Sequence, residues 1–573
     1  MTVSFCLSAI LALGALAWHP SPDWVDTPDP VASPRARKGG TIRLNGGQPP
    51  KSFNAYVDGN TYTRMTFDLM YENLIGVDSS TLEFTPSLAR RWAVSEDGTE
   101  FVFEIDERAH WSDGHPVTAA DVKWTFDAVM APESDTGSWK MSLGAFDSPE
   151  VVNTRTVRFR KKGGSVKNWR DIMHCGMFWV LPKHAFEKQD FNRLDFVGAP
   201  VGCAYRISRV AEQIETEFSR VPQWWRANFP SCRNVCNFDK IVMRYYVDNE
   251  NAFEALKKRA IDVYPVYSAR IMAQETRGER FDRNWILKRR IKNHKPAGFQ
   301  GFAMNMRKKP FSDIRVRQAM AHLLDRRTMN RTMMHDEYFL QNSFSSDIYD
   351  SSSPCTNKFY EYDVELAKKL FAEAGYSDGF EFTFLSRSSS DDKFLALFDH
   401  ALRQCGVKMH IVRKDFAGWM RDMDGFNYEM TWAAWGASLF KNPEPMWLSS
   451  EADRKGSNNI TGFRSEAVDR EIAAEKTMET VPERMAAYRR IDALIAAECP
   501  YALLWNVDTV RLLYWNKFGT PKTVLSKYSD EDAILSYWWY DEDKAAELKE
   551  AMENHTCLPD VPVIVDFDAE FGK

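Results

Sequence analysis

The sequence predicts a mixed α/β protein built from at least two lobes. The chain has 573 residues, which is far more than one ordinary hydrophobic core holds. Segments with the two-residue period of strands alternate along it with segments that have the 3.6-residue period of helices. Such alternation is typical of mixed α/β lobes. The 44% hydrophobic and 27% charged residues are ordinary for a folded protein and exclude global disorder.

The N-terminal part of the chain predicts a strand, a helix and two tight turns ahead of a longer helix. Both turns contain an Asp-Gly pair, at 97–98 and 113–114. Thr118 is expected to cap the helix that starts at Ala119. The expected order is strand 41–44, helix 57–71, strand 101–105 after the first turn, and helix 119–129 after the second.

Residues 301–327, GFAMNMRKKPFSDIRVRQAMAHLLDRR, predict one strand, one turn and one helix. Phe302 and Met304 alternate with smaller or polar residues, which indicates a strand with one buried face. Asp313 or the serine before it can cap a helix with an apolar stripe. The arginines at 326 and 327 are expected to end that helix, where positive charge complements its dipole.

Strand and helix periods continue to alternate beyond residue 327. The expected elements are helix 364–374, strand 380–385, helix 393–405, strands 407–412 and 428–435, helices 465–476 and 481–497, strand 500–507, and a last helix after the aromatic run 538–540.

Charge and motifs exclude several classes of protein. A net charge of -6 over this length gives no reason to expect nucleic acid or an anionic membrane surface as a partner. The sequence has neither a phosphate-binding G-x-x-x-x-G-K-[ST] loop nor a dinucleotide-binding glycine motif after a strand, so we expect no bound cofactor.

The N-terminus predicts export. Residues 3–17 form the only long apolar run, which is short for a membrane span and ends in small residues, as a signal peptide does. We expect cleavage after Ala17, so that residues 1–17 are the signal peptide. The stretch 18–38 is rich in Pro, Ser and Asp and is interpreted as a disordered leader.

Eight cysteines follow the expected cleavage point, and an even number in an exported protein permits disulfides. Cys232 and Cys236 are the one pair we would name, because they are close enough in sequence to close a short loop. Buried free thiols are the favoured interpretation of the other six.

Two motifs invite a catalytic or metal-binding interpretation. Residues 375–379 match the G-x-S-x-G pattern of serine hydrolases, but they follow a helix and precede a strand, the reverse of the order that exposes a nucleophile. A helix cap followed by a turn is therefore expected there. His110 and His115 flank the Asp113 turn and could hold a metal, although a structural hairpin is the favoured interpretation.

Several motifs resemble the family 5 extracellular solute-binding proteins of bacterial ABC transporters. They are LARRWAVSEDGTEFVFEIDERAHWSDGHPVTAADVKWTF at 88–126, PVGCAYRI at 200–207, and FAMNMRKKPFSDIRVRQAMAHLLDRR at 302–327. The resemblance covers most of the chain after residue 39 and is nearest to the Yej-type oligopeptide or microcin C subgroup. Cys203-Ala204 departs from the small-Gly-Pro sequence that is usual in this family.

The resemblance implies a type II periplasmic-binding-protein fold of the large, cluster C kind, with two lobes that close on a ligand by a hinge motion. Lobe I would comprise 39–75, 190–298 and 505–573, with an extra subdomain at 76–189. Lobe II would comprise 299–504.

The resemblance also implies a monomeric carrier in the periplasm that delivers oligopeptides to a permease-ATPase complex in the inner membrane. One alternative is the same fold with another solute: an oligosaccharide, an opine-like compound or a nickel chelate. The alternative from another class is a periplasmic peptidase or amidase, for which no nucleophile-base pair can be assembled from this sequence.

By the same resemblance, ligand would lie between the first strand and loop and the end of the strand at 428–435. Where relatives have an aspartate that pairs with the peptide's amino group, this chain has Ser438; Glu444 and Glu451 are candidates to replace it. Packing is the ordinary role of any single tryptophan, but the two at this strand end enter a loop. The expected ligand contacts are Asn45, Gly46, Gly47, Gln48, Phe53, Asn305, Trp432, Trp435, Gly436, Ala437, Ser438 and Asn459.

Overall fold

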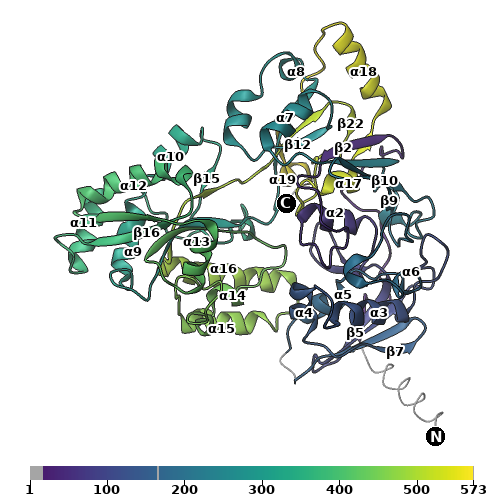
Figure 1. Ribbon diagram of the computed structural model, residues 1–573, viewed down its shortest axis with the longest axis horizontal. Coiled ribbons are helices and arrows are strands. Elements are labelled where there is room, and N and C mark those ends of the chain that lie inside the picture. The colour runs from purple at the N-terminus through teal and green to yellow at the C-terminus, as the bar shows by residue number, and fades with distance from the viewer. Residues whose placement is uncertain (1–16, 164–166, 572–573) are drawn as a thin grey trace. The chain divides into compact units, whose positions relative to one another are not determined.

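A computed structural model describes residues 17–163 and 167–571 (Figure 1). The chain divides into two compact units. Unit 1 comprises Met1–Val266, Arg277–Ile291 and Arg511–Lys573, and unit 2 comprises Tyr267–Thr276 and Lys292–Val510. The expected lobe II, 299–504, falls inside the main segment of unit 2. The expected subdomain 76–189 is part of unit 1, and its boundaries remain a prediction. The expected signal peptide lies outside the described residues except for Ala17.

The described part of unit 1 contains three sheets of four or five strands and two two-stranded sheets. Their strand orders are β1-β5-β6-β8-β7, β2-β11-β10-β9, β12-β21-β13-β24, β3-β4 and β22-β23. The strands are β1 Trp18–His19, β2 Thr41–Asn45, β3 Ile75–Val77, β4 Phe84–Pro86, β5 Ala89–Val94, β6 Glu100–Ile105, β7 Glu150–Asn153, β8 Thr156–Arg160, β9 Tyr205–Ala211, β10 Glu215–Arg220, β11 Lys240–Arg244, β12 Val263–Pro265, β13 Ile286–Lys292, β21 Val510–Trp515, β22 Phe518–Gly519, β23 Trp539–Tyr540 and β24 Ile564–Asp566.

Helices pack around these sheets. The longest of them lie in or near segments where the spacing of apolar residues predicted a helix. They are α2 Thr61–Asp68, α3 Ala119–Met130, α4 Gly137–Leu143, α5 Arg170–Gly176, α6 Lys183–Phe186, α7 Asn249–Lys257, α8 Glu279–Asp282, α17 Ala533–Tyr537, α18 Glu542–Glu553 and α19 Phe567–Phe571. The predicted cap of α3 is confirmed: Thr118 is the N-cap residue. It forms a capping box with Asp121, whose Oδ2 accepts from the Thr118 hydroxyl and from the Thr118 backbone N–H, both at 2.8 Å.

The stretch 18–38 is ordered, which corrects the expectation of a disordered leader. Strand β1 pairs antiparallel with β5. Val31 is buried, and the Tyr537 hydroxyl donates to Asp29 Oδ2 at 2.8 Å. Composition favoured disorder, but these contacts reach residues far away in the sequence that no local pattern reveals.

The expected Cys232–Cys236 disulfide is also corrected, since both residues are free, buried thiols. Cys232 ends a short 3-10 helix and its sulfur lies 3.6 Å from the Ser231 hydroxyl. Burial raises the pKa of the Cys236 thiol to about 12, so it remains protonated.

Unit 2 is built on one five-stranded mixed sheet in the order β17-β16-β18-β14-β19, with the pair β15-β20 beside it. Strand β16 is parallel to β17 and β18, and β14 is antiparallel to β18 and β19. The strands are β14 Phe299–Met304, β15 Phe339–Leu340, β16 Glu381–Ser386, β17 Lys408–Arg413, β18 Met430–Trp435, β19 Tyr501–Leu503 and β20 Trp505–Asn506. The helices are α9 Ile314–His322, α10 Arg326–Met333, α11 Val364–Glu373, α12 Asp392–Gln404, α13 Phe416–Asp424, α14 Glu444–Trp447, α15 Glu466–Glu475 and α16 Val481–Glu498.

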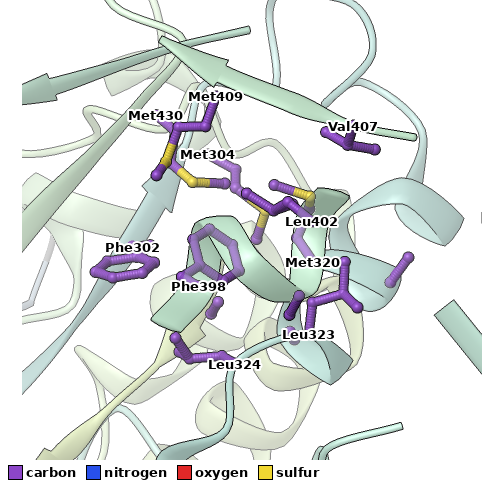
Figure 2. Close-up of a cluster of buried hydrophobic side chains, with 14 of the residues drawn as sticks. Phe302, Met304, Met320, Leu323, Leu324, Phe398, Leu402, Val407, Met409 and Met430 are labelled. Atoms are coloured by element: carbon purple, nitrogen blue, oxygen red, sulfur yellow. The ribbon is translucent and has the colours of Figure 1, made fainter. Parts of the chain in front are cut away.

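Strand β14 is buried on both faces, whereas the sequence predicted one. Phe302 and Met304 face a core formed with α9 and α12 (Figure 2). Ala303, on the opposite face, packs in a second core with α13, α15 and α16. Helices on both sides of the sheet therefore remove the exposed face that the alternation suggested.

The predicted helix after β14 forms, but it ends earlier than expected. Asp313 is its cap and accepts from the backbone N–H of Arg315 at 2.8 Å. Arg326 and Arg327 start a new helix, α10, which Asp325 caps. The expectation that these arginines end the first helix is thus corrected: Asp325 is the N-cap of a second helix, which begins at Arg326. Among the described residues, no helix is long and apolar enough to cross a membrane.

Candidate functional site

The expected contacts fall on both units, and those on unit 2 centre on the end of β18. The Trp432 indole N–H donates to Gln300 Oε1 at 3.1 Å, and its ring packs edge-on against Phe302. The Trp435 indole N–H donates to the Tyr501 hydroxyl at 3.1 Å. Both rings are half-buried. They therefore pack against the sheet and leave part of their apolar surface exposed.

Beyond Thr431, strand β18 has an edge with which no described strand pairs. Strand β16 pairs with β18 only at Met430 and Thr431, whereas β14 pairs with the whole of β18. The Asn305 N–H donates to the Glu429 carbonyl, which makes them a hydrogen-bonded pair of the antiparallel ladder. By alternation, the N–H and C=O of Ala434 point to the unpaired edge.

Ala434 was missing from the expected site residues. It is exposed, while Ala433 before it is buried. The strand itself was predicted from the sequence. The register with β14, which decides which backbone groups face outward, was not. An extended chain segment could pair with this edge through main-chain hydrogen bonds.

The loop after β18 is exposed at Gly436, Ala437 and Ser438. The Ser438 hydroxyl donates to the Phe440 carbonyl at 2.7 Å, which closes the loop on itself. Glu444 forms an ion pair with Lys476, and Glu451 accepts from Arg454 Nε at 2.8 Å. Both acidic candidates for binding an amino group thus already have cationic partners.

The expected contacts on unit 1 follow β2. The Asn45 side chain joins two loops: its Nδ2 donates to the Tyr246 carbonyl at 3.1 Å, and its Oδ1 accepts from Gly47 N–H at 2.9 Å. A Cβ on Gly46 would lie 2.9 Å from Tyr245, and one on Gly47 would lie 2.9 Å from Tyr62. Gly47 also has φ +63°. The protein's own tyrosines thus leave no room for a side chain at either glycine.

Gly46 and half-buried Phe53 line one small cavity of about 10 Å³ in unit 1. That volume is close to the minimum for a single water molecule, so the cavity by itself cannot hold a solute. Gln48 is exposed, and its carbonyl accepts from Asn60 Nδ2 at 3.5 Å. Contact of these residues with a ligand remains a prediction.

Asn305 and Asn459, both expected as ligand contacts, lie in the interior of unit 2. Asn305 Nδ2 donates to the carbonyls of Phe426 and Tyr428, at 3.1 and 2.8 Å. Asn459 Nδ2 donates to the Phe463 carbonyl at 2.9 Å. Each is about 1% exposed or less, so their amides satisfy buried backbone groups.

The G-x-S-x-G segment forms the helix end and turn that its order predicted. Gly375 has φ +88° and donates to the Ala372 carbonyl after α11, and Gly379 has φ +80° just before β16. The segment is therefore not a strand-to-helix elbow, and it offers no nucleophile in the geometry that hydrolases use.

Comparisons with known proteins agree with this fold. The family described as bacterial extracellular solute-binding proteins, family 5 Middle, matches residues 83–457. The chain is 26% identical to YejA of Escherichia coli K12 over 570 residues, covering 91% of this chain and 92% of that protein. It is 23% identical to a protein of Agrobacterium fabrum named "Probable peptide-binding protein YejA", covering 90% and 92%.

Two solved structures show the same fold at lower identity. DppA of Helicobacter pylori in complex with the peptide STSA is 18% identical, with a TM-score of 0.65 and coverage of 88% and 99%. NikZ of Campylobacter jejuni in complex with Ni(L-His) is 18% identical, with a TM-score of 0.64 and coverage of 87% and 99%. The fold is thus that of the type II periplasmic binding proteins. The family match, residues 83–457, covers well over half of this chain. The chain therefore belongs to the family 5 bacterial extracellular solute-binding proteins, the solute-binding components of ABC importers.

Proposed function

We propose that this protein captures oligopeptides in the periplasm and delivers them to an ABC permease in the inner membrane. The observation that carries the proposal is the unpaired edge of β18, where the Ala434 N–H and C=O point outward. An extended peptide aligned there would continue the sheet by main-chain hydrogen bonds. Such bonds are independent of side-chain identity, which suits a carrier of varied sequences.

Hydrogen bonds at this edge supply only part of the affinity. Each contributes about 1 kcal/mol net, because the peptide gives up bonds to water. The exposed parts of Trp432 and Trp435 flank Ala434 in the sequence and would cover apolar side chains of the peptide. Affinity would therefore come from several main-chain bonds together with apolar burial.

We further propose that the peptide's amino group is not bound by an acidic side chain of the β18 loop. Ser438 is neutral and its hydroxyl is engaged with the Phe440 carbonyl. Glu444 and Glu451 are paired with Lys476 and Arg454. Blocking the amino group should thus change affinity little.

The relatives support peptides as the first solute class to test. The A. fabrum relative is named as a peptide-binding protein, and the H. pylori structure contains a peptide. The C. jejuni structure contains a nickel complex, so the same fold also carries other solutes. Export through the 1–17 signal peptide, the monomeric state and the role as a carrier without catalytic activity complete the proposal.

A thermal-shift screen tests this proposal. Ligand-free mature protein would be tested with peptides, the same peptides acetylated at the amino group, oligosaccharides, opines and Ni(L-His). A solute that binds only the folded protein raises the melting temperature. We expect equal shifts from free and acetylated peptides. A shift from sugars, opines or nickel complex alone would overturn the peptide proposal, and loss of peptide mass during incubation would indicate a peptidase.

A further inference from the structure

Three side chains with metal-binding atoms converge at the surface of unit 1. His184 Nε2 lies 2.7 Å from Asp113 Oδ2, and His115 Nδ1 lies 3.2 Å from the same oxygen. All three ligand atoms lie within 4.8 Å of one another. The two imidazole rings are stacked, with centroids 4.3 Å apart. Asp113 and His115 were considered from the sequence, but His184 comes from a segment 71 residues away in the chain.

The protein's own backbone fixes the turn that carries Asp113 and His115. The His115 N–H donates to Asp113 Oδ1 at 3.1 Å, which leaves Oδ2 to face the two histidines. The Trp111 N–H donates to the His115 carbonyl at 2.8 Å, and the Trp111 ring is fully buried. The turn is therefore anchored to the core, and its two ligand residues keep their positions without a metal.

The third ligand is held by a different element. His184 lies in the short helix α6, whose first backbone N–H, that of Lys183, donates to Asp121 Oδ1 at 2.9 Å. Asp121 belongs to α3, the helix that follows the turn. This helix follows the turn directly in the chain and holds the start of α6, so it links the two segments that carry the ligand atoms.

We propose that Asp113, His115 and His184 bind a divalent transition-metal cation, with Zn²⁺ as the reference ion. Two imidazole nitrogens and one carboxylate oxygen suit zinc, copper, nickel and iron better than the all-oxygen sites of calcium or magnesium. Ligand atoms on a zinc ion are each about 2.0–2.2 Å from the metal, so they lie about 3–3.5 Å apart. The two distances to Asp113 are already close to that spacing.

A metal here would have open positions for water, because three ligand residues converge in the described part of the chain and all three are exposed. It would also tie the 111–115 turn to α6, so metal binding would stabilise the folded protein. This inference concerns residues outside the expected solute contacts and does not rest on the proposed function.

His110 provides a matched control within the same turn. Its Nδ1 lies 3.0 Å from the Trp111 carbonyl, and it is not part of the cluster. The test uses the mature chain, residues 18–573, produced without a histidine tag and stripped of metal with EDTA. Zn²⁺ would be titrated by calorimetry, and Co²⁺ by its visible absorption, into wild type and the variants H115Q, H184Q, D113N and H110Q.

We expect wild type and H110Q to bind one Zn²⁺ per chain. H115Q and H184Q should bind Zn²⁺ at least about 10-fold more weakly, because loss of even a residue that supports a metal ligand typically lowers metal affinity by that factor. Saturating Zn²⁺ should raise the melting temperature of wild type and H110Q but not of H115Q or H184Q. D113N retains an oxygen for the His115 N–H, so it should fold normally and still bind more weakly. Equal Zn²⁺ affinity in wild type, H115Q and H184Q, or no Zn²⁺ binding by wild type, would overturn the proposal.

Discussion

Ala434→Pro perturbs the proposed binding edge while leaving the sheet intact. Proline removes one backbone N–H, and at Ala434 that group points to the unpaired edge of β18. The hydrogen bonds to β14 come from Thr431, Ala433 and Trp435 and are retained. Position 433 has the extended conformation that the residue before a proline requires.

The expected loss follows from the number of bonds removed. One main-chain hydrogen bond contributes about 1 kcal/mol net, which corresponds to roughly a fivefold increase in the Kd of a peptide. Ala434→Ser is the matched control, since it alters the side chain and keeps the N–H. Serine should leave the Kd within about twofold of wild type.

Calorimetric titration with one peptide from the thermal-shift screen gives both values. The melting temperature of each ligand-free variant shows whether the fold is retained. If Ala434→Pro remains folded and binds the peptide as tightly as Ala434→Ser, the peptide does not use this N–H, and pairing of the peptide with the edge of β18 at Ala434 is refuted.

Three further predictions concern stability. Phe302→Ala should lower the free energy of unfolding of unit 2 by about 3–5 kcal/mol in urea, because this fully buried ring lies between the sheet and α12; a loss below about 1 kcal/mol would contradict that packing. Gly47→Ala should lower the free energy of unfolding by about 1–2 kcal/mol, because φ is positive at this position and the new Cβ meets Tyr62. Gly59→Ala, which has open space and no positive φ, should lower it much less. Equal effects of the two substitutions would argue against strain at Gly47. Burial lowers the pKa of the His322 imidazole from 6.5, so its contribution to stability is present above pH 6.5 and is lost as the pH falls below it. Urea unfolding at pH 8 and pH 5.5 should show a smaller pH effect in His322→Gln than in wild type, and an unchanged effect would exclude this histidine as the cause.

Local patterns predicted the elements of unit 2 well. The strand at Phe302, the Asp313 cap and the helix after it all form as the sequence indicated. The error at Arg326 arose because a second cap, Asp325, follows the first helix directly. Period and capping are encoded within a few residues, so they can be read locally.

Contacts between distant segments could not be predicted in the same way. The stretch 18–38 is held by β5 and by Tyr537, and neither partner is adjacent in the sequence. His184 reaches Asp113 across 71 residues of sequence, through a helix, α6, whose first N–H is bonded to Asp121 of α3. Burial likewise decided the role of Asn305, whose amide was expected near a ligand and instead satisfies carbonyls in the interior.

Hydrogen exchange in the segment 430–438 shows whether a peptide pairs with the edge of β18. We expect a saturating peptide to slow exchange of the Ala434 amide, because that N–H becomes bonded to the added strand. The amides of Ala433 and Trp435, which already face β14, should change less. A peptide that binds tightly and leaves the exchange of Ala434 unchanged would contradict main-chain recognition at this edge.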